Sequence, residues 1–156
     1  MDLHPDCASL AFLLGTWKGS GAGEYPTIES FSYLEESTFS HVGKPFLAYG
    51  QKTRDATTGL PLHAETGYLR AVGDRKVEFL IAQPSGIVEL HVGTVEAGEL
   101  TLALEWVQTT PTAKSVIDVQ RNFSVDGEVM TYTLAMTAVG QPLTHHLRAQ
   151  LHRSTD

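Results

Sequence analysis

Cysteine is almost absent from this sequence, with Cys7 the only one among 156 residues. A single thiol can form no intrachain disulfide, and it cannot build a zinc or iron–sulfur site from cysteines alone. Any redox chemistry that this protein performs must therefore come from a bound cofactor.

Long apolar runs and clusters of positive charge are also missing. The longest uninterrupted apolar stretch, Leu10–Leu14, is far shorter than the roughly 20 residues that a membrane-spanning helix needs. The 11 Lys and Arg against 18 Asp and Glu give a net charge of −7, and both halves of the chain are acidic. Without a cationic patch, nucleic acid and membranes are not expected partners, and a small molecule or cofactor is.

The first residues do not resemble a secretory signal. Met1–Asp6 carries acidic instead of basic residues, and no long apolar region follows it. We therefore expect a cytoplasmic protein. A chain of this length matches one domain, so residues 1–156 are predicted to form a single unit.

Most of the sequence is predicted to be all-β. A short helical segment is expected at Pro5–Leu14, before the helix-breaking Gly15. Beyond it, residues alternate in polarity in segments rich in Val, Thr, Phe, Tyr and Leu, and turns such as Asp126-Gly127 separate them. The pattern predicts ten antiparallel strands near residues 16–24, 29–40, 46–53, 62–71, 76–82, 87–95, 99–108, 115–125, 128–138 and 143–153.

Ten consecutive strands with short turns favour an up-and-down barrel, because closure removes the exposed sheet edges. An eight-stranded barrel is either filled by side chains or holds one small ligand, so a ten-stranded barrel should enclose something larger. The alternative is a two-sheet sandwich with a dry core.

The segment Gly15–Ile28 is unusually rich in glycine, with four glycines in nine residues. A strand pattern follows it, which excludes a dinucleotide-binding loop because that loop opens a helix. One interpretation is a glycine-kinked barrel strand with Trp17 as a core plug. The other is that Tyr25-Pro26-Thr27 forms a loop at the barrel rim, with the Thr27 hydroxyl near a ligand.

A pair of histidines, His145 and His146, lies in the last predicted strand. Strand alternation puts His146 and Arg148 on one face, and His145, Leu147 and Leu151 on the other, so one histidine of the pair must point inward. Imidazole is a common ligand of metals and haem iron, although a lone strand histidine is more often solvated or hydrogen-bonded.

Other candidate sites are weaker. The remaining histidines that we considered lack metal-ligand spacing and are interpreted as surface or structural residues: His4, His41, His63 and His91. Glu35 and Glu36 point to opposite faces of their strand, and no Gly-x-Ser-x-Gly motif is present, so a hydrolase is not expected.

Taken together, the motifs resemble those of the nitrobindin family of haem-binding β-barrels, over nearly the whole chain. The order and spacing of the motifs carry the resemblance. They are Gly15-x-Trp17-x-Gly19-x-Gly21, Gly23-x-Tyr25-Pro26-Thr27, Phe31-x-Tyr33-Leu34-Glu35-Glu36, His41-Val42-Gly43-x-Pro45, Glu65-x-Gly67-Tyr68-Leu69-Arg70, Ala113-Lys114, Gly140-Gln141-Pro142-Leu143 and His146-Leu147.

The resemblance implies a ten-stranded barrel similar to fatty-acid-binding proteins, with one haem b per chain. It places the axial iron ligand, and hence the catalytic centre, at His146, with Thr27, Lys114 and Arg148 as further haem-binding candidates. His145 remains a rival, because it shares a face with apolar residues, although a bulge near Pro142 could shift that face.

The activity implied by the resemblance is binding of nitric oxide and, with ferric haem, isomerisation of peroxynitrite to nitrate. The alternative is a non-enzymatic carrier of a fatty acid or another small hydrophobic ligand. Such a carrier would need no imidazole in its cavity and would favour an Arg or Tyr clamp for a carboxylate. Whether two barrels associate as a homodimer is left open by the sequence.

Overall fold

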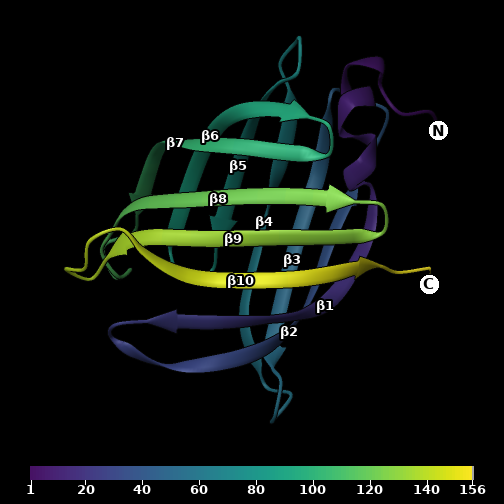
Figure 1. Ribbon diagram of the computed structural model, residues 1–156. Coiled ribbons are helices and arrows are strands. Elements are labelled where there is room, and N and C mark those ends of the chain that lie inside the picture. The colour runs from purple at the N-terminus through teal and green to yellow at the C-terminus, as the bar shows by residue number, and fades with distance from the viewer. Residues whose placement is uncertain (156) are drawn as a thin grey trace.

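A computed structural model shows ten antiparallel strands closed into one barrel, with a short helix across one end (Figure 1). It describes residues 1–155. Each strand pairs with its neighbours in sequence, and β1 pairs with β10 to close the barrel. The predicted barrel is therefore confirmed over the sandwich. The elements are η1 (Pro5–Leu13), β1 (Gly15–Tyr25), β2 (Ile28–Ser40), β3 (Phe46–Asp55), β4 (Pro61–Ala71), β5 (Lys76–Gln83), β6 (Ile87–Glu96), β7 (Glu99–Thr109), β8 (Val116–Asp126), β9 (Val129–Ala138) and β10 (Thr144–Arg153).

The N-terminal helix η1 is a 3₁₀ helix. It buries Cys7, Leu10 and Leu13, which are spaced by three residues, the repeat of a 3₁₀ helix. A backbone hydrogen bond across three residues lies at each end of the helix. The Cys7 amide donates to the His4 carbonyl, and the Leu14 amide donates to the Ala11 carbonyl. The predicted helical segment is thus confirmed, one residue shorter at its C-terminal end.

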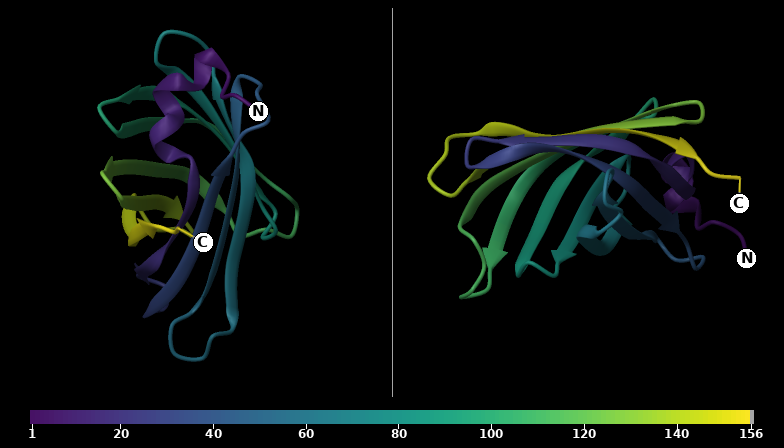
Figure 2. Two further views of the ribbon diagram at one scale, coloured as in Figure 1. Left: turned by 90° about the vertical axis from the view of Figure 1, so that its right-hand side faces the viewer. Right: turned by 90° about the horizontal axis from the view of Figure 1, so that it is seen from below.

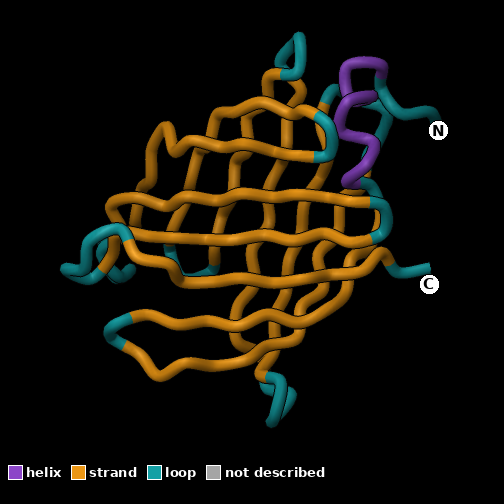
Figure 3. The backbone as a smooth tube through the Cα atoms, viewed as in Figure 1, coloured by secondary structure: helices purple, strands orange, loops and turns teal. Residues whose placement is uncertain are grey.

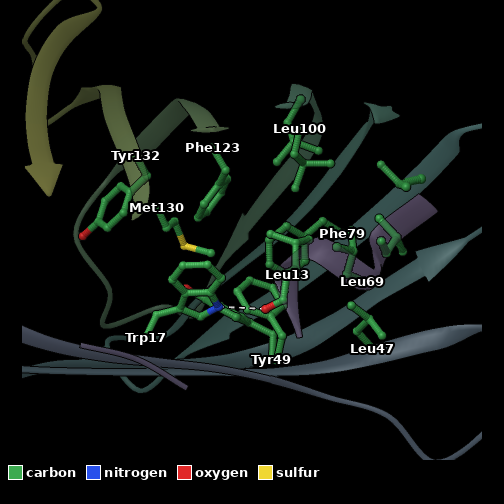
Figure 4. Close-up of a cluster of buried hydrophobic side chains, with 14 of the residues drawn as sticks. Leu13, Trp17, Leu47, Tyr49, Leu69, Phe79, Leu100, Phe123, Met130 and Tyr132 are labelled. Atoms are coloured by element: carbon green, nitrogen blue, oxygen red, sulfur yellow. Dashed lines mark hydrogen bonds between the residues drawn. The ribbon is translucent and has the colours of Figure 1, made fainter. Parts of the chain in front are cut away.

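Trp17 fills the end of the barrel that η1 covers. Its side chain is fully buried, and its indole Nε1–H donates a hydrogen bond of 2.7 Å to the Leu13 carbonyl (Figure 4). The Arg153 guanidinium lies 4.2 Å from the centre of the indole ring, a cation–π contact. Trp17 is therefore the predicted core plug, and it joins η1 to the first and last strands.

The opposite end of the barrel is formed by loops. Figure 3 shows loops there between β1 and β2, between β7 and β8, and between β9 and β10. Both chain termini lie at the end that η1 covers (Figure 2). The two ends are thus different: η1 and Trp17 fill one, and loops form the other.

Gly19 is required where β1 packs against the backbone of β10. A Cβ atom at this position would collide with the backbone carbonyl of Gln150, which cannot move without shifting the strand. We expect Gly19→Ala to lower the free energy of unfolding by about 2–3 kcal/mol, the upper range for overpacking. Urea unfolding would measure the loss. Gly50→Ala is the matched control, because a Cβ there meets only the hydroxyl of Thr38 at 3.3 Å.

Candidate functional site

A cavity of about 640 Å³ opens at the loop end of the barrel. Apolar residues with exposed side chains surround its mouth, among them Ile28, with 45% of its surface exposed, and Leu62, with 47%. Exposed apolar residues around a cavity are typical of a site that takes an apolar molecule. The interior changes from apolar near the mouth to charged at the floor.

A β-bulge decides which of the paired histidines enters this cavity. In the register of β10 with β9, His145 pairs with Ala135 and Leu147 pairs with Leu134, so His146 is the extra residue between them. As a result, His146 and Leu147 both line the cavity. His145 lines a separate depression outside the cavity. The bulge thus lies at His146 itself, a few residues beyond Pro142.

The His146 ring is held in one orientation. Its Nδ1 lies 3.0 Å from the carbonyl oxygen of Glu24, which can only accept a hydrogen bond, so Nδ1 carries the proton. The rings of Tyr25 and Phe31 meet it edge-on, with centroids 5.4 and 6.4 Å away. Nε2 is left as a lone-pair donor, with no hydrogen-bond partner in the described part of the chain. A backbone-oriented imidazole is typical of metal-ligating histidines.

Burial lowers the pKa of His146, because the neighbouring protein removes water from the imidazole. The ring is therefore neutral at pH 7, the form that binds metals. Tyr25 in turn is fixed by its hydroxyl, which accepts a hydrogen bond from the Ala138 amide at 3.1 Å and lies 3.1 Å from the Met136 carbonyl. The contacts of Tyr25 hold the wall beside His146 in place.

Two of the other predicted site residues reach the cavity and one does not. Thr27, in the turn between β1 and β2, and Lys114, in the loop between β7 and β8, line the mouth and are exposed. Arg148 lies beside His145 in the depression outside the barrel. Because strand alternation resumes after the bulge, Arg148 faces outward while Leu147 faces inward.

The floor of the cavity is a buried ionic network centred on Arg121. Nη1 and Nη2 of its guanidinium donate to the two carboxylate oxygens of Glu65, at 2.8 and 3.0 Å. Nε and Nη2 donate to the two oxygens of Glu89, at 2.9 and 3.1 Å. The three side chains are at most 5% exposed. Arg121 is thus held by two carboxylates at once.

Both carboxylates of this network are ionised. Burial alone would raise the pKa of Glu65 and of Glu89, but the charge of Arg121 outweighs it and holds both values below the usual range. Burial would likewise lower the pKa of Arg121, and the two carboxylates raise it well above its usual value. The network therefore consists of one cation between two anions.

Two further side chains extend the network into the core. Tyr49 donates its hydroxyl to Glu65 at 2.8 Å. Nε2 of His91 lies 2.7 Å from Glu89, and the ring is completely buried. Nδ1 of His91 has no hydrogen-bond partner among residues 1–155. A proton on Nε2 can be donated to Glu89, whereas a proton on Nδ1 would be left without an acceptor.

A second group of hydrogen bonds lies beside the ionic floor. The Tyr132 hydroxyl donates to Glu35 at 2.6 Å and lies 2.8 Å from the Tyr33 hydroxyl, while Ser37 donates to the other Glu35 oxygen. Burial raises the pKa of Glu35 above its usual value. Burial also raises the pKa of both tyrosines, which stay protonated.

The sequence did not single out the residues of the ionic floor. Glu65, Glu89 and Arg121 come from β4, β6 and β8, and no short motif unites them. The usable signal was the two-residue repeat of a strand, because each residue lies on the inward face: Glu65 shares its face with Leu69, and Arg121 shares its face with Phe123. His63, interpreted as surface or structural, also lines the cavity, 3.4 Å from Glu65.

The described residues contain no cluster of three or more His, Cys, Asp or Glu side chains arranged to hold a metal ion. Within the same range, no helix has both the length and the hydropathy needed to cross a membrane.

Comparison with known proteins gives a consistent result. Residues 6–153 match the family described as THAP4-like, heme-binding beta-barrel domains. The chain is 57% identical to peroxynitrite isomerase 2 of Mycobacterium ulcerans, over 99% of this chain and 98% of that protein. It is 52% identical to the peroxynitrite isomerase of Nocardia farcinica, over 97% and 92%. The crystal structure of Rv2717c from M. tuberculosis superposes with a TM-score of 0.92 at 50% identity, over 98% and 99% of the two chains.

Proposed function

We propose that this chain, which belongs to the family of THAP4-like haem-binding β-barrels, holds one haem b through His146 and isomerises peroxynitrite to nitrate. The observation that carries the proposal is the orientation of His146. Its Nδ1–H is bonded to the Glu24 carbonyl, which leaves a neutral Nε2 available to the cavity.

The residues around the cavity fit a haem. His146 would be the protein ligand of the iron, and the apolar mouth would contact the flat macrocycle. Lys114 and Thr27, both at the mouth, would hold the negatively charged propionates near solvent. Bound ferric haem supplies a Lewis-acidic iron for peroxynitrite rearrangement, and its open position is also where nitric oxide would bind.

The alternative, a carrier of a fatty acid, is less well supported by this cavity. The structure does place an arginine and tyrosines inside, the groups expected of a carboxylate clamp. However, Arg121 already binds both oxygens of Glu65 and of Glu89, and Tyr132 donates to Glu35. A fatty-acid carboxylate would have to displace one of these side chains and would be repelled by the others.

Hemin titration of the apoprotein tests the proposal. We expect a Soret band that saturates at one equivalent, and a higher melting temperature, because hemin binds the folded barrel and not the unfolded chain; a tenfold excess over Kd is worth about 1.4 kcal/mol. The loaded protein should convert peroxynitrite to nitrate faster than free hemin does. A fluorescent fatty acid that binds more tightly than hemin, with no saturable Soret band, would instead support the carrier.

A further inference from the structure

We infer that the buried network of Glu65, Glu89 and Arg121 gives the cavity a net negative charge, and that this charge selects a porphyrin with a trivalent metal over one with a divalent metal. The inference rests on the proposed function, since it concerns the cofactor of the same cavity. It assigns the network a role in specificity that lies beyond holding the barrel together.

The charge count follows from the contacts in the floor. Glu65 and Glu89 are two anions, and Arg121 is the one cation between them. His91 is not counted as a charge, because a proton on its buried Nδ1 would have no acceptor among the described residues. Glu35 belongs to a separate group of hydrogen bonds, in which it accepts from Tyr132, and is not part of this count. The network of Glu65, Glu89 and Arg121 therefore carries one uncompensated negative charge.

Burial makes this charge effective. The side chains of Arg121, Glu65 and Glu89 are exposed by 5%, 2% and 1%, so water and salt screen them little. Lys114, by contrast, is exposed at the mouth, where solvent weakens its field. A cation that enters the cavity thus meets an unscreened anionic floor.

Burying charged side chains lowers the stability of a protein unless their interactions offset the loss of hydration. Replacing a buried ionic cluster by apolar side chains of similar volume is often neutral or stabilising. A porphyrin ring carries two negative charges at its nitrogens, so a trivalent metal leaves its centre positive and a divalent metal leaves it neutral. Only the trivalent form compensates the floor, and the network is thereby stabilised when that form binds.

The test compares the apoprotein's affinity for gallium(III) protoporphyrin IX and zinc(II) protoporphyrin IX by fluorescence titration. The two probes share one ring and differ in the charge of the metal. Titrations are made at pH 8, where histidines of ordinary pKa are uncharged. The measured quantity is the ratio of the two dissociation constants, compared between variants so that intrinsic differences between the metals cancel.

Glu89→Gln and Glu65→Gln each remove one negative charge and leave Arg121 paired with the remaining carboxylate, so the network becomes neutral. We expect either variant to reduce the preference for gallium on the order of tenfold, the factor that one unit charge produces across about 12 Å at an effective dielectric constant of about 20. Glu105→Gln is the matched control, since it removes the same charge from an exposed position on β7 and should change the ratio less than twofold.

A second measurement uses the unmodified protein. A preference that originates in the buried floor should persist from about 0.05 to 1 M salt, whereas one that originates in surface charge should be lost as the Debye length shortens. An unchanged ratio in both glutamine variants, or a preference lost in salt, would overturn the inference. Neither outcome touches the proposed function, which fails instead if neither porphyrin binds in a one-to-one ratio.

Discussion

His146→Ala is expected to weaken hemin binding by more than about a hundredfold, because changes to the groups that merely orient a metal ligand already cost about 10–100-fold. The substitution removes the only imidazole that the β10 bulge turns into the cavity. Hemin titration followed at the Soret band measures the loss. Conversion of peroxynitrite to nitrate should fall to the level of free hemin.

The neighbouring residue provides the control. His145→Ala deletes the same side chain one position away, but outside the cavity, so its hemin affinity and ferric spectrum should match the parent protein. Loss of the Soret band in His145→Ala with its retention in His146→Ala would reverse the assignment. If both variants bind hemin like the parent, the ligand lies elsewhere, and His63, on the cavity wall, is the next residue to test.

Arg121→Met is expected to lower the free energy of unfolding at pH 7 by about 3–5 kcal/mol, the cost of breaking a buried ion pair from one side. The substitution leaves Glu65 and Glu89 as two buried carboxylates without their common cation. Urea unfolding measures the change. Arg148→Met is the matched control, because Arg148 is exposed, and a surface substitution usually changes stability by less than about 0.5 kcal/mol.

The stability of the parent protein and that of Arg121→Met should change in opposite directions when the pH is lowered. In the parent, the pKa values of Glu65 and Glu89 lie below that of an unfolded glutamate, about 4.3, so their ion pairs contribute stability above that pH and lose it as the pH falls further. In Arg121→Met, burial without a cation raises both pKa values, so protonation relieves the penalty and stability should rise as the pH falls from 7 toward 5. A variant whose stability falls over that range would contradict the network described here.

The strands were predictable from the sequence because their signal is local. Each expected strand lies within two residues of the observed one at both ends, since turn residues with positive φ, such as Gly98 and Gly127, set the boundaries. The paired histidines were not resolved by the same rule. Alternation places His145 and Leu147 on one face of the strand and His146 on the other. The bulge breaks this alternation at His146, so that His146 and Leu147 both face the cavity.

The ionic floor could not be read from the sequence, because its members meet only when the barrel closes. Arg121 is 56 positions from Glu65 and 32 from Glu89 along the chain. A lone charged residue in a strand carries no sign of its partner, and each could equally be a solvated side chain. Arg148 shows the opposite error. It lies two residues after His146, so alternation predicted that both would face the cavity, but the bulge leaves Arg148 facing outward.

The pairing of β1 with β10 has a consequence for how the cofactor is acquired. Every other neighbouring pair in the barrel is joined by a short connection, whereas this pair unites the two ends of the chain. Contacts between such distant segments are entropically the most expensive to form and are expected late in folding. His146 lies on β10 and the carbonyl that orients it belongs to Glu24 on β1, 122 positions away. The histidine is therefore oriented only once β10 has paired with β1, so we expect haem to bind the closed barrel instead of directing its folding.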